Sequence, residues 1–129
     1  MVRWGSAEQS ARERIERFQV AGRPHSLVES LSGGNQQRLL LSFLPLKPEI
    51  LLLENPTRGL DVESVHWVWD HLAAFAARGT TIVFSSPELD EILMVSDRVL
   101  VFFDGRVIKD ERPGDTNALE LGRAIAGKV

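Results

Sequence analysis

The stretch from Leu31 to Val62 constrains the fold of this 129-residue chain more than any other part of it. It opens with Ser32, Gly33 and Gly34, a turn that leads into a helix. Ser32 is placed to act as the N-cap of that helix, and the two glycines leave their backbone N–H groups uncovered. Because the first turn of a helix has unpaired amides and the positive end of the helix dipole, this turn forms an anion site.

The second half of the same stretch predicts a buried strand that ends in polar residues. Residues 50–53 are apolar without alternation, which is typical of a central parallel strand covered on both faces. The strand delivers Glu54 and Asn55 to its carboxyl end, where an open parallel sheet places ligands. A helix over 63–78 and a β-branched strand over 80–85 follow, so the order implies a right-handed parallel crossover.

The C-terminal part predicts a hairpin and a last helix. Asp104-Gly105 stands between residues 98–103 and 106–109, which is a strong hairpin signal. Asp115 or Thr116 is expected to cap the helix that follows.

Composition limits the classes of function. With 43% hydrophobic residues and a net charge of −3, the chain is expected to form a soluble globular domain with a core. Charges of both signs are interspersed without a basic block, which argues against a nucleic-acid partner. The absence of cysteine excludes disulfides and thiolate metal sites. No apolar run approaches the roughly 20 residues that cross a bilayer, so a membrane role must come through a partner.

These motifs resemble those of ATP-binding cassette (ABC) ATPases. Residues 31–37, LSGGNQQ, are similar to the family signature in the form found in sugar and nucleoside importers whose two cassettes lie in one polypeptide. Residues 50–55 fall at the Walker B strand of the family, 57–61 at its D-loop and 85–86 at its switch position. The order and spacing agree over roughly residues 7–126, which is nearly the whole chain.

The resemblance implies an α/β fold, with part of a P-loop NTPase (RecA-like) parallel sheet and flanking helices. We expect residues 1–45 to form part of the helical subdomain that carries the signature, and 46–129 to form the C-terminal part of the RecA-like catalytic subdomain. The signature helix is expected over 35–44. Its expected buried positions are Leu39, Leu40 and Phe43.

No G-x-x-x-x-G-K-[ST] phosphate loop occurs in the sequence. The chain therefore resembles the C-terminal half of a cassette: a cut piece, the product of a broken gene, or one half whose complement is supplied separately. The resemblance also places a phosphate-loop strand between the strands at 50–53 and 80–85. Those strands must then pair directly or leave a gap, with unpaired groups costing roughly 1 to 3 kcal/mol each. We expect self-association or a rearranged sheet.

In the family, each ATP is held between the phosphate loop of one cassette and the signature of the other. The resemblance implies that this signature binds the terminal phosphate of a partner's ATP through Ser32, Gly33, Gly34, Asn35, Gln36 and Gln37. It also assigns Gly59, Leu60 and Asp61 to a D-loop that touches the opposite nucleotide site. From the residues alone, the alternatives are a Ser-capped helix, and a turn in which Asp61 caps the next helix.

The chain's own half-site departs from the family pattern. Glu54 replaces the aspartate that holds Mg²⁺ through water, and its carboxylate reaches about 1.5 Å further. Asn55 replaces the glutamate that polarises the attacking water, and it cannot accept a proton. Ser86 replaces the switch histidine. Together the departures predict weak or absent hydrolysis, as in the second, degenerate cassette of such importers.

The expected function is that of an ATP-binding subunit of an ABC importer for sugars or nucleosides, which couples binding and hydrolysis of ATP with Mg²⁺ at a composite dimer site to transport. The alternative is a non-hydrolysing nucleotide-binding or scaffold cassette that lends its signature to a competent partner. A DNA-repair or chromosome-maintenance ATPase is disfavoured because no coiled-coil heptads flank the signature.

The expected partners are a second cassette and transmembrane permease subunits, at the cytoplasmic face of the inner membrane. ATPase activity is expected of the full-length subunit with its partner, and this chain alone is expected to be inactive. The transported solute is not specified by these residues.

Overall fold

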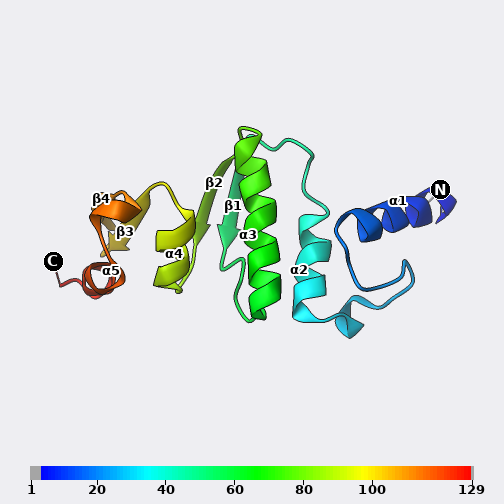
Figure 1. Cartoon of the computed structure of the whole chain (residues 1–129), viewed down its shortest axis with the longest axis horizontal. Coiled ribbons are helices and arrows are strands. Elements are labelled where there is room, and N and C mark those ends of the chain that lie inside the picture. Colours follow the sequence, from blue (N-terminus) through cyan, green and yellow to red (C-terminus); the bar gives the residue numbers. More distant parts are fainter. Residues whose placement is uncertain (1–3, 129) are drawn as a thin grey trace. The chain divides into compact units, whose positions relative to one another are not determined.

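The computed structural model describes residues 4–128 (Figure 1). The chain divides into two compact units, one that ends at Phe84 and one that begins at Ser85. The predicted boundary between residues 45 and 46 lies inside the first of these units. The assignment of its two sides to a helical and a catalytic subdomain stays a prediction.

The first unit contains a strand–helix–strand element preceded by helices. Its elements are α1 (Trp4–Arg17), the 3-10 turn η1 (Val28–Ser30), α2 (Gly33–Leu41), β1 (Ile50–Glu54), α3 (Val62–Ala77) and β2 (Thr81–Ser85), whose last residue opens the second unit. The Thr81 amide donates to the Glu49 carbonyl at 2.9 Å, and the Thr80 hydroxyl donates to the Pro48 carbonyl at 2.8 Å. The two strands therefore start side by side and run in the same direction, which confirms the predicted α/β crossover.

β1 and β2 are hydrogen-bonded neighbours. Direct pairing is one of the two arrangements expected for these strands, so no gap has to be filled between them. The pairing satisfies their facing backbone groups without a second chain, and self-association stays a prediction.

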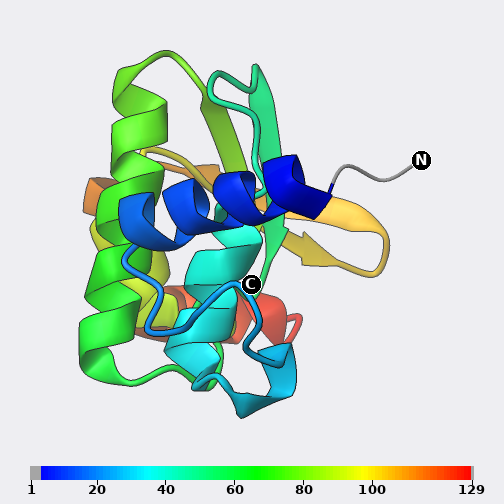
Figure 2. The ribbon, with the colours of Figure 1, turned by 90° about the vertical axis from the view of Figure 1, so that its right-hand side faces the viewer.

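Within residues 4–128, one face of this strand pair is covered and the other is open. Leu51 of β1 is 6% exposed, and Trp69 of α3 meets Phe84 of β2 edge-on with ring centroids 4.8 Å apart. Figure 2 shows α3 along this side of the strands. On the other face Leu52 is 73% exposed. The exposed side chains of that face are Ile50, Leu52 and Val83. The prediction of a strand covered on both faces is wrong for the described residues, because one layer of helix covers only alternate side chains.

The signature helix differs from the prediction at both ends. α2 runs from Gly33 to Leu41 and not over 35–44. Leu41 is 3% exposed, whereas Leu40 and Phe43 are 62% and 64% exposed, so their predicted burial is wrong. Phe43 lies beyond the end of α2, where the Arg14 guanidinium stands 5.2 Å from its ring centroid. The end of the helix at Leu41 removes Phe43 from the helical face that the prediction assumed.

An aromatic cluster joins the chain after α1 to α2 and α3. The Trp67 and His71 rings stack with centroids 3.7 Å apart, and the Phe18 ring centroid lies 5.6 Å from that of His71. The Arg38 guanidinium of α2 stands 4.5 Å from the Trp67 ring centroid. Burial, which removes hydration from an imidazolium, lowers the pKa of His71 below its ordinary value of 6.5.

The second unit is a hairpin packed on helices. Its elements are α4 (Leu89–Val95), β3 (Val99–Phe103), β4 (Arg106–Glu111), the 3-10 turn η2 (Pro113–Asp115) and α5 (Ala118–Ile125). β3 and β4 are antiparallel, and Asp104 and Gly105 have φ values of 46° and 72°. Two positive φ values in a two-residue loop define a type I′ turn, so the predicted hairpin is confirmed. Its core is Val99, Val101, Leu121 and Ala124.

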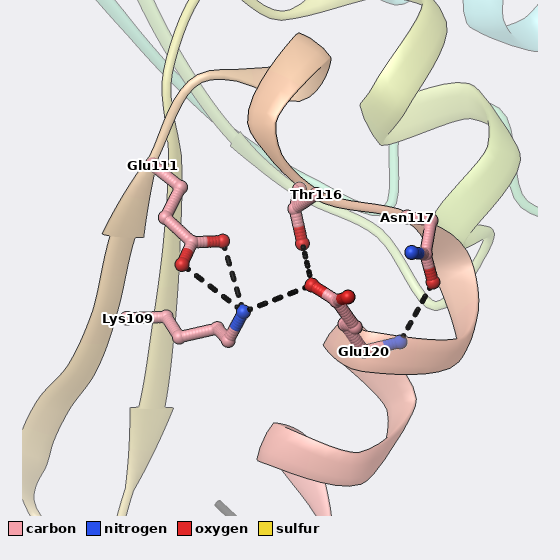
Figure 3. A network of polar contacts seen from close by, with 5 residues as sticks. All are labelled: Lys109, Glu111, Thr116, Asn117 and Glu120. Atoms are coloured by element: carbon pink, nitrogen blue, oxygen red, sulfur yellow. Dashed lines mark hydrogen bonds and ion pairs between the residues drawn. The ribbon is translucent and has the colours of Figure 1, made fainter.

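A polar network lies between β4 and the start of α5 (Figure 3). Lys109 Nζ lies 2.9 Å from Glu111 and 3.5 Å from Glu120. The Glu120 amide donates to Asn117 Oδ1 at 3.0 Å, so Asn117 is the N-cap of α5. The predicted cap at Asp115 or Thr116 is wrong, because η2 uses Asp115 and the chain stays extended at Thr116.

Leu72 and Leu52 give a matched test of the one-sided cover of the β1–β2 pair. Leu72 is 1% exposed in the α3 core and Leu52 is 73% exposed on the open face. We expect Leu72→Ala to lower the free energy of unfolding by roughly 2 to 5 kcal/mol. Leu52→Ala, a surface change, is expected to alter it by less than about 0.5 kcal/mol. Urea unfolding followed by circular dichroism measures both, and equal losses would contradict the one-sided cover.

The stacked His71 makes stability depend on pH. Because its folded pKa lies below 6.5, the unfolded chain takes up the proton more readily. The neutral ring therefore stabilises the fold above pH 6.5, and this contribution is lost as the pH falls. We expect the wild type to lose more stability between pH 7.5 and pH 5 than His71→Phe, which keeps an aromatic ring without a titrating group. Urea unfolding at each pH measures both proteins. If the wild type and His71→Phe lose the same free energy of unfolding over this range, the titration of His71 does not contribute to stability.

Candidate functional site

The turn before α2 presents Ser32 and Gly33 to solvent, while the next residue, Gly34, is buried. Ser32 is the N-cap of α2, as predicted, and its Oγ accepts from the Asn35 amide at 3.4 Å. The first two amides of a helix, here those of Gly33 and Gly34, have no acceptor inside it. Ser32 and Gly33 are exposed, so the turn is open to a ligand. Hydroxyl, amides and helix dipole together can bind an anion.

The side chains that follow the glycines hold this turn in place. Asn35 Oδ1 accepts from the Ala21 amide at 2.6 Å, while Asn35 Nδ2 donates to Ser32 Oγ at 2.8 Å. Gln36 Nε2 donates to the Leu31 carbonyl at 3.0 Å. Gln37 is half-buried. The hydrogen bonds of Asn35 and Gln36 in the structure are to other residues of this chain. Direct contact of Asn35, Gln36 and Gln37 with ATP stays a prediction.

The predicted D-loop forms the turn that starts α3. Gly59 has a φ of 74°, a left-handed conformation that glycine adopts without strain, and the Leu60 amide closes the turn on the Thr57 carbonyl at 3.2 Å. Asp61 is the N-cap of α3, and its carboxylate accepts the amide and the hydroxyl of Ser64, both at 2.9 Å. These hydrogen bonds to the ionised form lower the pKa of Asp61. The capping role is confirmed, and contact with an opposite nucleotide site stays a prediction.

A contact that the sequence did not indicate joins the signature to this turn. A Cβ atom on Gly34 would lie 2.1 Å from Ser64 Oγ and 3.0 Å from Ser64 Cβ. The first turns of α2 and α3 therefore touch through two small residues, and Ser64 is itself held by Asp61. The sequence offered one signal for this contact, the small residues at the starts of both helices. Small residues also occur at many helix starts as caps, so this signal was not specific.

The carboxyl end of β1 carries the predicted acid and amide. Glu54 is exposed at the last position of β1. Within residues 4–128, no group of three or more His, Asp or Glu side chains gathers where it could hold a metal. A single carboxylate nevertheless fits Mg²⁺, which is usually bound by one or two carboxylates and takes its other ligands from phosphates and water.

Asn55 ends the strand by changing the backbone conformation. Its φ is 48°, and its carbonyl accepts the Arg58 amide at 3.2 Å. Asparagine is one of the few residues that adopt the left-handed conformation readily. Its side-chain amide can orient a water molecule but cannot take a proton from it. Ser86, the predicted switch residue, belongs to the second unit, and its Oγ accepts the Glu88 amide at 3.1 Å.

Solved structures with this fold are ATP-binding cassettes. An ATP-binding subunit of an ABC transporter superimposes with a TM-score of 0.74 at 20% identity, over 95% of this chain and 55% of that one. A putative metal-chelate type ABC transporter in an inward-facing conformation gives a TM-score of 0.71 at 19% identity, over 92% of this chain and 48% of that one. The fold is therefore that of an ABC-type cassette.

Curated relatives narrow the class. The chain is 39% identical over 119 residues to the nucleoside import ATP-binding protein NupA of Lactococcus lactis, which is 91% of this chain and 24% of the relative. It is 35% identical over 127 residues to the guanosine import ATP-binding protein NupO of Bacillus subtilis, which is 97% of this chain and 25% of that relative. It is 46% identical over 88 residues to the xylose import ATP-binding protein XylG of Pseudomonas syringae, which is 67% of this chain and 17% of the relative.

This chain is a partial ATP-binding cassette, homologous to the ATP-binding proteins of sugar and nucleoside import. It spans about a quarter of the length of the first two of these relatives. No family model matches it. Across residues 4–128, none of the helices has the length and apolar character needed to cross a membrane.

Gly34 and Ser64 give a test of the α2–α3 contact. We expect Gly34→Ala to lower the free energy of unfolding by about 1 to 3 kcal/mol, because its Cβ overlaps Ser64. Gly33→Ala is the steric control, since its Cβ would meet only Leu60 Cδ2, at 3.6 Å. The double variant with Gly34→Ala and Ser64→Gly removes the overlap. In the Ser64→Gly background, Gly34→Ala is therefore expected to lower the free energy of unfolding by much less than it does in the wild type. Urea unfolding measures these free energies. If the losses of the two single variants simply add in the double variant, Gly34 and Ser64 do not pack against one another.

Proposed function

We propose that this chain acts as part of the ATP-binding subunit of an ABC importer for a sugar or a nucleoside. In this role its signature turn holds the terminal phosphate of an ATP molecule bound to a second cassette. The observation that carries the proposal is the turn at the start of α2, where Ser32 and Gly33 are exposed and the amides of Gly33 and the buried Gly34 have no acceptor inside the helix. The names of the relatives, which are import proteins for nucleosides, guanosine and xylose, support the class of solute.

The chain's own half-site contributes little hydrolysis in this proposal. Bound Mg²⁺ would neutralise phosphate charge, and Glu54 is the residue that would hold it, through water. Asn55 orients water at the same strand end without accepting its proton. Ser86 can donate a hydrogen bond but cannot carry a positive charge. Catalysis at the composite site therefore depends on the partner cassette, to which this chain supplies the signature.

The partners in this proposal are a second ATP-binding cassette and the transmembrane permease subunits. The subunit works at the cytoplasmic face of the inner membrane, where those permeases would hold it. The isolated chain is proposed to self-associate as well. The open apolar face of Ile50, Leu52 and Val83 supports this, because exposed apolar patches favour association.

A complementation experiment tests the role of the signature. A complete nucleoside-import cassette protein, disabled in its own signature motifs, is mixed with increasing amounts of this chain, and phosphate release from ATP is measured. We expect the wild-type chain to restore hydrolysis and Ser32→Ala to restore at least about ten-fold less, because one donor to the transferred phosphate is lost.

Ser10→Ala is the matched control for this experiment. Ser10 lies exposed on α1, so the same chemical change there removes no donor from the turn. The control is expected to restore as much hydrolysis as the wild-type chain. Equal restoration by Ser32→Ala, or no restoration by the wild-type chain, would contradict the proposed function.

A further inference from the structure

The side-chain amide of Asn35 is fixed between two partners whose chemistry sets its orientation. The Ala21 backbone amide is a donor, so the atom that faces it, at 2.6 Å, is the carbonyl oxygen Oδ1. The other end of the side chain, Nδ2, then faces Ser32 Oγ at 2.8 Å. Asn35 therefore donates to Ser32 and does not accept from it.

The position of the Ala21 amide is itself held by buried neighbours. Val20 and Phe18 are each 7% exposed, and the Val20 amide bonds to the Ile15 carbonyl at 3.0 Å. On the other side, the Gly22 amide donates to the Val20 carbonyl at 2.9 Å. The loop after α1 is thus a fixed support for Asn35.

This arrangement decides what the Ser32 hydroxyl can do. A serine hydroxyl has two lone pairs and one proton. Its oxygen receives both Asn35 Nδ2 at 2.8 Å and the Asn35 amide at 3.4 Å. Both acceptor positions are then occupied by donors, and the remaining capacity of Ser32 is to donate its own proton.

We propose that Asn35 is a positioning residue that turns Ser32 into a hydrogen-bond donor aimed at the terminal phosphate of the partner's ATP. The inference rests on the proposed function and adds to it a role for Asn35 that involves no contact with the nucleotide. A phosphate oxygen accepts hydrogen bonds only, so a hydroxyl already committed as donor needs no reorientation when the anion arrives.

Asn35→Asp is the sharpest variant because it has the same shape and the opposite polarity. One carboxylate oxygen still accepts the Ala21 amide, and the other accepts the Ser32 proton, which is then withdrawn from the ligand. An acidic residue in the first turn of a helix is favourable, so the variant is expected to fold. Its extra negative charge also repels an anion, and this second effect has to be separated from the first.

A double-mutant cycle separates the two effects. The probe is inorganic tripolyphosphate, titrated into the ¹⁵N-labelled chain while NMR follows the amides of Gly33 and Gly34. Asn35→Asp is compared in the wild-type and in the Ser32→Ala background, where only the charge effect remains. Asn117→Asp is the matched control, with the same change in charge at the N-cap of α5.

We expect Asn35→Asp to weaken tripolyphosphate binding by about ten-fold more in the wild-type background than in the Ser32→Ala background. Asn117→Asp is expected to leave the affinity unchanged. Equal weakening in both backgrounds would assign Asn35 a structural or charge effect only and overturn the inference, while leaving the proposed function intact. A wild-type chain whose Gly33 and Gly34 amides do not respond to tripolyphosphate overturns the proposed function and the inference together.

Discussion

The close packing of Gly34 against Ser64 is the constraint on which the candidate site depends. It brings the first turns of α2 and α3 together with almost no side chain between them, since a single methyl group on Gly34 would overlap the Ser64 hydroxyl. The signature turn and the D-loop turn are therefore placed by one contact. Asp61 closes the arrangement, because the carboxylate that caps α3 also binds the Ser64 hydroxyl.

Local signals predicted much of the fold. The apolar run before Glu54, the helix after Asp61 and the β-branched run after Gly79 predicted β1, α3 and β2, and Asp104-Gly105 predicted the hairpin. The Ser32 cap was predictable for the same reason, because a cap depends on residues three positions apart. These features are set by neighbours in sequence, which periodicity and turn chemistry describe well.

The failures concern partners that are distant in sequence. The exposure of Leu40 and Leu52 depends on which layers cover α2 and β1, and the run of apolar letters does not contain that information. The hydrogen bond that fixes the Asn35 side chain needs Ala21, fourteen residues away, and the contact of Gly34 with Ser64 needs a partner on another helix. The resemblance assigned the candidate site residues by their place in a motif, and for Asn35 and Gln36 it did not indicate the hydrogen bonds that these side chains make.

The two chemical roles assigned to this chain use different side chains. The donors of the signature turn are held by the packing of α2 on α3 and by the hydrogen bonds of the Asn35 side chain. Neither set of contacts includes Glu54, Asn55 or Ser86. Asn55 also suits its own position, because its left-handed backbone would cost roughly 1 to 2 kcal/mol for most other side chains. In the proposed role, a change of side chain at Glu54, Asn55 or Ser86 would therefore leave these donor contacts of the signature turn in place. In the composite site that we propose, that turn is the part of this chain on which hydrolysis by the partner depends.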